Sequence, residues 1–120
     1  MSTRSAAPFG YGGYEFKWSQ AEKTVARRAF EQALKREFEQ VVVETKRRAG
    51  EIEQIADVWA LAEYVFGRRK EIETRYDYRY SVLPSVLADL MRAGRLSEND
   101  LSGLDDDKLA EIRRVAQLRS

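Results

Sequence analysis

Apolar residues recur at helical spacing along the first long stretch of the chain. Ser19 followed three positions later by Glu22 has the pattern of a capping box, which marks the start of a helix. Beyond it, one face carries Ala26, Phe30, Ala33, Leu34, Phe38, Val41, Val42, Thr45 and Ala49. The opposite face is rich in lysine, arginine and glutamate. A period of three to four residues predicts one long amphipathic helix over about 19–49.

A second helix is predicted after Gly50, because glycine is a poor helix former and interrupts the period there. The period resumes through Ile52, Ile55, Val58, Ala62, Val65, Ile72 and Tyr76, which predicts a helix over about 51–75. Arg69 stands in this stripe where an apolar residue is expected. A cation on that side must reach water or pair with a carboxylate, and Glu63 is one candidate partner.

A third helix is predicted around Pro84. Proline is tolerated in the first turn of a helix, where the amides lack partners in any case. With Ser81 as the cap, Pro84 falls in that first turn, and Gly94 is placed to close the helix at its C-terminus. This element begins a small helical head region.

Two short elements are predicted to complete the head. Ser97 with Asp100 predicts a helical turn, and Asp105 is placed to cap a final helix that ends near Leu118. No strand pattern and no internal repeat emerges along the sequence. The predicted fold class is therefore all-α, with long amphipathic helices and a small helical head.

The first 17 residues differ in composition from the rest. They are rich in glycine, serine and alanine, and Gly10, Gly12 and Gly13 leave the backbone too free for a stable element. We predict a flexible N-terminal tail over 1–17 and a single helical domain over 18–120.

Composition excludes several classes of chemistry. The 120-residue sequence contains no cysteine and no histidine, so disulfides, thiolate nucleophiles and the usual zinc sites are absent. The aspartates of DDDK at 105–108 are explained by the start of a helix, where carboxylates favour the dipole. We predict a protein that is not an enzyme and that has no cofactor and no metal site.

Charge and hydropathy limit the partners. The chain has 21 basic and 20 acidic residues, a net charge of +1, and acidic residues interrupt every basic cluster. This pattern is typical of solvated helix faces and predicts no nucleic-acid binding. No apolar run approaches the roughly 18 residues of a membrane span, and no secretory signal is visible. We expect no membrane insertion and a cytoplasmic location.

The second predicted helix carries an unusual row of side chains. Trp59, Glu63, Phe66 and Lys70 follow one another at steps of four, three and four, so they share one face. Two interpretations remain open for this row. The aromatic residues are either ordinary core residues beside charged neighbours or a patch that binds a protein partner, since tryptophan and arginine often dominate interfaces.

A homodimer is predicted from the first helix. Phe38 and Val42 extend its apolar stripe over more turns than a small monomer readily covers. We expect the interface between the two copies to use both long helices.

Four segments carry a resemblance to a known family: WSQAE (18–22), QIADVWAL (54–61), RRKEIETRYDYRYSV (68–82) and ADLMRAGRLSENDLSGLDDDK (88–108). In order and spacing they resemble the cyanobacterial fluorescence recovery protein, without gaps from Trp18 to about Leu118. The resemblance implies a small, dimeric, all-helical regulator without a cofactor. It implies binding to the light-activated orange carotenoid protein, mainly to its C-terminal NTF2-like domain. Members speed its return to the dark-adapted orange form and its release from the phycobilisome, which ends photoprotective quenching.

The resemblance also assigns roles to residues. Trp59 and Arg69 match the functional tryptophan and arginine of the family, and Glu63 stands where the family usually has aspartate. The full set expected to bind the partner is Trp59, Glu63, Phe66, Arg69 and Lys70. The set expected at the dimer interface is Phe38, Val42, Val58, Ala62 and Val65.

Three further positions depart from the family pattern. Ala62 replaces a frequent histidine, and Pro84 and Ser85 stand where cyanobacterial members tend to have isoleucine and phenylalanine. These departures indicate a divergent homologue. The alternative function is therefore a helical, dimeric adaptor of the same fold that binds a different partner, in an organism without phycobilisomes.

Overall fold

The computed structural model describes residues 17–118, and every regular element in this range is helical. In chain order they are α1 (Gln20–Gly50), α2 (Ile55–Arg75), α3 (Leu83–Arg92), the 3₁₀ turn η2 (Glu98–Leu101) and α4 (Asp106–Leu118). The predicted all-α class is confirmed. The predicted tail over 1–17 lies outside the described residues except for Lys17. Among the described helices, none has both the length and the apolarity needed to cross a membrane.

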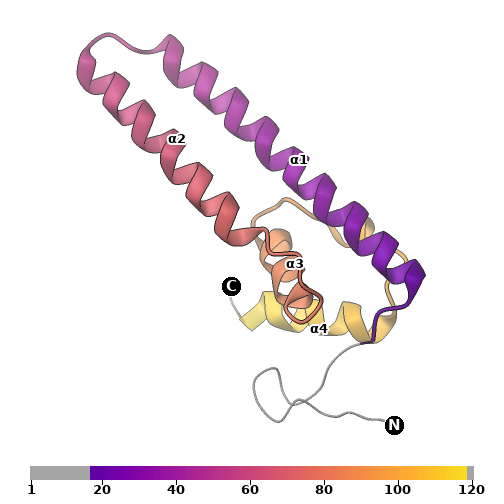
Figure 1. Cartoon of the computed structure of the whole chain (residues 1–120). Helices are drawn as coiled ribbons and strands as arrows, with labels where there is room; N and C mark the ends of the chain where they lie inside the picture. The colour runs from indigo at the N-terminus through magenta and orange to yellow at the C-terminus, as the bar shows by residue number, and fades with distance from the viewer. Residues whose placement is uncertain (1–16, 119–120) are drawn as a thin grey trace.

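The helices form a stem and a head. Figure 1 shows α1 and α2 running side by side as a long antiparallel hairpin, with α3 and α4 gathered near the N-terminal part of α1. The buried core joins α1 to the head through Ala26, Ala29, Phe30, Ala33, Leu83, Val86, Leu87, Ala88, Leu90, Leu96, Leu101, Leu104, Ile112 and Val115. No residue of α2 is fully buried in the chain. The outer part of the stem therefore holds its shape mainly through contacts between two helices.

The ends of α1 agree with the sequence pattern. The Ser19 hydroxyl accepts a hydrogen bond from the Glu22 N–H at 3.1 Å, and the Glu22 carboxylate accepts one from the Ser19 N–H at 3.1 Å. This reciprocal pair is the predicted capping box. At the other end, α1 stops at Gly50, as predicted.

The start of α2 differs from the prediction. The helix begins at Ile55, so the predicted start at 51 is wrong by four residues. The Asp57 carboxylate accepts hydrogen bonds from the N–H groups of Glu53 at 3.0 Å and Gln54 at 3.2 Å. Because these donors are satisfied from inside the first turn, Gln54 becomes the cap and the preceding residues form the connection.

The start of α3 also differs. Val82 occupies the cap position, so the predicted Ser81 cap is wrong, while Pro84 does lie in the first turn. The helix closes as predicted at Gly94, which has a φ of 77°. The Arg95 N–H donates to the Leu90 carbonyl at 2.8 Å and the Gly94 N–H to the Met91 carbonyl at 3.0 Å, the pair of bonds of a Schellman motif.

The last two elements begin where the sequence places them. Ser97 and Asp100 form a second capping box at η2. Asp105 immediately precedes α4, and its N–H donates to the Glu22 carboxylate at 2.9 Å. Arg36 pairs with Asp100 at 2.9 Å and donates to the Arg95 carbonyl at 2.8 Å. These polar contacts fix the head against α1 around the apolar core.

A buried carboxylate, Glu37, joins the stem to the head. Its side chain is fully buried and pairs with Arg68 and Arg75 at the C-terminal half of α2, and with Arg95 after α3 at 3.1 Å. The Tyr76 hydroxyl lies 2.9 Å from the same carboxylate. Burial would raise the pKa of Glu37, but the hydrogen bonds from Arg68, Tyr76 and Arg95 outweigh it and hold the pKa below its usual value.

A second buried ion pair, Glu22 with Lys108, predicts a pH dependence of stability. Their side chains are 3% exposed and lie 3.0 Å apart. Burial would raise the pKa of Glu22, but the N–H groups of Asp105 and Ser19 and the Lys108 ammonium lower it to about 2. A lowered folded-state pKa stabilises the fold above the unfolded value of roughly 4.3, and the contribution is lost as pH falls toward 2.

Replacing Glu22 by glutamine should therefore lower the free energy of unfolding at pH 7 by on the order of 2–3 kcal/mol, with a smaller difference near pH 3. The measurement is urea unfolding followed by circular dichroism at both pH values and one protein concentration. Glu53→Gln, an exposed change of the same chemistry, is the control. A loss that is equal at both pH values would show that the charge of Glu22 does not contribute.

Candidate protein-binding surface

The orientation of α2 is set by the side that faces α1. Arg68 and Arg75 reach the buried Glu37 of α1, and the Arg48 guanidinium of α1 lies 4.3 Å from the centre of the Tyr64 ring. Leu61, one turn before Tyr64, and Ile72, between Arg68 and Arg75, are half-buried and share that side. One face of α2 is thereby committed to the hairpin, and the remaining faces are open.

Trp59 and Phe66 lie on an open face. Trp59 is 61% exposed and Phe66 is 63% exposed, although both are large aromatic residues. Glu63 is exposed between them, and the Lys70 ammonium lies 5.7 Å from the centre of the Phe66 ring. The structure places this row outside the core of the chain. Exposed aromatic residues bordered by charge are typical of a protein-binding surface, which favours the second of the two interpretations.

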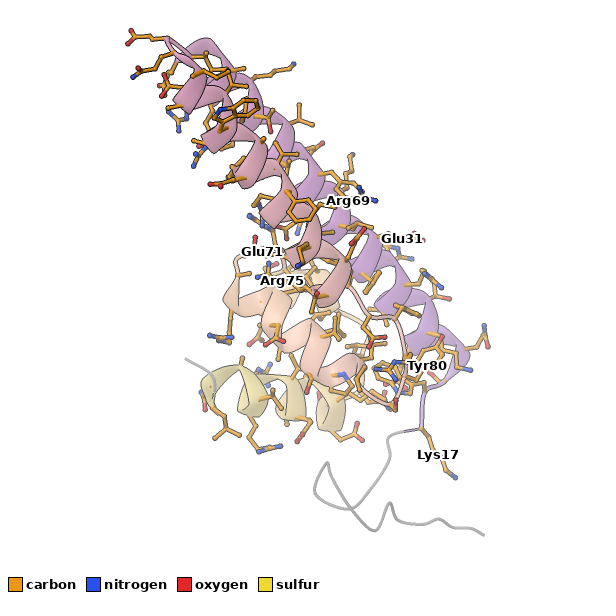
Figure 2. All side chains as sticks on the ribbon, turned by 60° about the vertical axis from the view of Figure 1, so that its left-hand side comes forward. Lys17, Glu31, Arg69, Glu71, Arg75 and Tyr80 are labelled. Atoms are coloured by element: carbon orange, nitrogen blue, oxygen red, sulfur yellow. The ribbon has the colours of Figure 1, made fainter. Side chains whose placement is uncertain are left out.

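Arg69 projects from the same helix into solvent (Figure 2). Its side chain is 75% exposed and pairs with Glu73 at 3.1 Å. The prediction that a carboxylate lies near Arg69 is confirmed, but the partner is Glu73 and not Glu63. A spacing of four residues places Glu73 one helical turn further along, whereas a spacing of six turns Glu63 to another side. An exposed pair of this kind contributes little to stability, so Arg69 is available for a partner.

The residues predicted at the dimer interface are only partly covered within one chain. Phe38 and Val42 are 51% and 52% exposed, and together with Leu34 and Val43 they line an apolar groove along α1. On α2, Ala62 is exposed. This chain alone leaves an extended apolar surface on both stem helices. The dimer contact itself stays a prediction.

Two members of that surface were not predicted as site residues. Val43 is 67% exposed and Ile55 is 61% exposed. Val43 follows Val42 directly and lies outside the predicted apolar face. An apolar residue at such a position was the sequence signal that could have identified it. Ile55 belongs to the apolar period predicted for the second helix, and it is the first residue of α2.

The residues of this surface are suited to binding. It combines exposed aromatic, aliphatic and charged side chains on a helical hairpin. Within residues 17–118, no group of three or more aspartates and glutamates is arranged to hold a metal ion. The chemistry available here is the burial of apolar area with charge pairing at its edge.

Comparisons with known proteins show which family the chain is similar to. Residues 18–116 match a family model described as photoprotection regulator fluorescence recovery protein. The chain is 36% identical over 104 residues to the fluorescence recovery protein of Synechocystis sp., covering 87% of this chain and 95% of that protein.

Solved structures give the same result. The fluorescence recovery protein of Fremyella diplosiphon is 38% identical with a TM-score of 0.81, covering 84% of this chain and 99% of that one. The Synechocystis fluorescence recovery protein is 35% identical with a TM-score of 0.81, and the covered shares are again 84% and 99%. The likeness extends over both the stem and the head.

Proposed function

The chain belongs to the fluorescence recovery protein family of photoprotection regulators, and we propose that it binds a light-activated orange carotenoid protein and speeds its return to the orange form. The expected contact is with the C-terminal NTF2-like domain of that partner. The observation that carries the proposal is the exposure of Trp59 and Arg69 on α2. These two residues match the family's functional tryptophan and arginine in sequence.

Such a regulator works through differential binding. A protein that only binds can speed a conformational change if it binds the transition state for closure more tightly than the open starting form. The stem is suited to this task because it is long, with α1 alone spanning about 46 Å at 1.5 Å per residue. Contact with two separated domains at once would raise their effective concentration, and no covalent bond forms or breaks.

A different partner is the alternative within the same fold. Ala62 on the open side of α2, and Pro84 and Ser85 in the first turn of α3, depart from the pattern of cyanobacterial members. These changes alter one position beside Trp59 and one end of the head. The aromatic and charged row itself is kept. The alternative is therefore an adaptor of the same fold that binds a different partner, such as a related NTF2-like domain.

The test is recovery of the orange state after illumination, measured with native protein, Trp59→Ala and Arg69→Leu. Loss of a central interface tryptophan typically removes 2 kcal/mol or more, so we expect about 30-fold weaker binding for Trp59→Ala. Arg69→Leu should also weaken binding while the fold is retained, because its ion pair with Glu73 is exposed.

Arg113→Leu provides the matched control, since Arg113 pairs with Glu98 and both side chains are about half exposed, at 50% and 51%. If native protein neither forms a complex on size exclusion nor changes the recovery rate, the alternative partner is favoured. Acceleration that survives both substitutions would keep the function and move the binding surface away from Trp59 and Arg69.

A further inference from the structure

A second surface lies at the opposite end of the stem from Trp59. Lys23, Arg27 and Arg28 on the first turns of α1 line an open groove together with Tyr78 and Tyr80 from the segment that follows α2. Figure 2 shows Tyr80 beside the N-terminal part of α1, near Lys17 and well away from Arg69. The groove brings together residues more than fifty positions apart in sequence.

The arginines of this groove differ from the others in the described part of the chain. Each arginine from Arg36 to Arg114 forms an ion pair with an aspartate or a glutamate. Within residues 17–118, Arg27 and Arg28 form none. The chain has nearly as many acidic as basic residues, so its composition would allow a carboxylate for almost every cation. Two adjacent guanidinium groups without an ion pair therefore stand out. They leave a local positive charge that the fold does not neutralise.

Aromatic rings hold the cations of the groove in place. The Arg27 guanidinium lies 4.0 Å from the centre of the Tyr78 ring, and the Lys23 ammonium lies 5.2 Å from the centre of the Tyr80 ring. Tyr78 is itself fixed by an edge contact with Phe30, with the ring centres 4.9 Å apart. A guanidinium stacked on a ring keeps its edge N–H groups for an acceptor.

The groove also remains positive at neutral pH. The Tyr78 phenol is neutral at pH 7 already at the ordinary tyrosine pKa of roughly 10. Burial raises its pKa further, to about 12, so it does not offset the neighbouring cations. Glu31 is the acidic residue among those that line the groove. The balance of charged residues there is three cations against one carboxylate.

We propose that this groove binds an acidic segment of a protein partner, through two carboxylates spaced by one helical turn. Lys23 and Arg27 are four residues apart on α1, so their side chains are separated by about 6 Å, which matches such a pair of carboxylates. Arginine forms charge-assisted, two-point hydrogen bonds with a carboxylate, and a held guanidinium loses little freedom in doing so. A nucleic acid fits less well, because three cations make too short a row to follow a phosphate backbone.

The test is an NMR titration of the full-length protein at low ionic strength. The probe is a blocked helical peptide with two glutamates four positions apart, and the same peptide with glutamines is the reference. Saturable shifts should appear in the amides of residues 23–28 and 78–80 with the glutamate peptide alone. They should weaken as salt shortens the screening length from about 30 Å at 0.01 M ionic strength to about 10 Å at 0.1 M.

A matched pair of variants isolates the site. Lys23→Gln with Arg27→Gln should weaken peptide binding about tenfold, the combined loss of two exposed charge pairs. Arg113→Gln with Arg114→Gln removes the same charge from adjacent arginines of α4 that are already paired, and should leave binding within about twofold of native. Equal loss in both variants, or no shift with native protein, would overturn the proposal.

A single-stranded oligonucleotide of equal charge is the third probe. Tighter binding of the oligonucleotide than of the glutamate peptide would replace the acidic protein segment by a nucleic acid and so also overturn the proposal. The experiment uses no carotenoid protein. Its outcome is therefore independent of the function proposed for Trp59 and Arg69.

Discussion

Replacing Glu37 by glutamine should lower the free energy of unfolding by about 3 kcal/mol, because the change leaves Arg68, Arg75 and Arg95 around a buried neutral amide. The loss falls at the low end for a broken buried pair, since these guanidinium groups retain some contact with water. The Tyr76 hydroxyl also loses its charged acceptor. Urea unfolding at pH 7 and fixed protein concentration measures the effect.

Glu53→Gln is the control for this prediction, because Glu53 is an exposed glutamate outside the buried cluster. A double-mutant cycle with Arg68→Gln separates the pairwise term from the general cost of substitution. We expect a favourable coupling between Glu37 and Arg68. An unfolding midpoint for Glu37→Gln equal to that of the control would mean that packing alone holds the stem to the head.

The parts of the fold that the sequence predicted well have local causes. The start of α1 depends on Ser19 and Glu22, and the end of α3 on Gly94, in each case through bonds between residues a few positions apart. Such helix-end signals can be recognised from a few neighbouring residues in the sequence. Ser97 with Asp100 belongs to the same group.

The errors arose where two local signals compete. Ser81 is a good capping residue, but α3 begins one position later because the Val86 N–H donates to the Val82 carbonyl. At the start of α2, the apolar period through Ile52 favours an earlier start, while Asp57 accepts bonds from the amides before Ile55 and sets the boundary there. Periodicity alone does not weigh these bonds against each other.

The candidate site depends on contacts between distant residues. A period of 3.6 places Trp59, Glu63 and Phe66 on one face of α2 but does not say which face meets α1. That rotation follows from Arg68 and the buried Glu37, which are 31 residues apart. From the sequence, Arg68 belongs to a basic cluster typical of a solvated helix face. The pattern therefore gave no sign that Arg68 faces α1, and it did not determine whether Trp59 is exposed.

We predict that the protein is a dimer and that substituting glutamate for Val42 converts it to a monomer. Val42 is 52% exposed in the single chain and lines the apolar groove of α1 with Leu34, Phe38 and Val43. If a second copy covers this groove, the new carboxylate is buried without a partner in both copies, at a cost of several kcal/mol per interface. The dimer dissociation constant should then rise by at least about 100-fold, since each 1.4 kcal/mol is a factor of ten.

Gln40→Glu tests whether the position, and not the added charge, causes dissociation. Gln40 is an exposed residue of the same helix, and two residues of helical rotation turn it about 200° from Val42, away from the groove. Sedimentation velocity over a series of concentrations should show a dimer for native protein and for Gln40→Glu, and a monomer for Val42→Glu. Circular dichroism should show that the helices are kept in all three, because the head core does not include Val42. If native protein sediments as a monomer at a concentration of roughly tens of micromolar, the predicted interface is contradicted. The apolar groove would then be free for a protein partner of another kind.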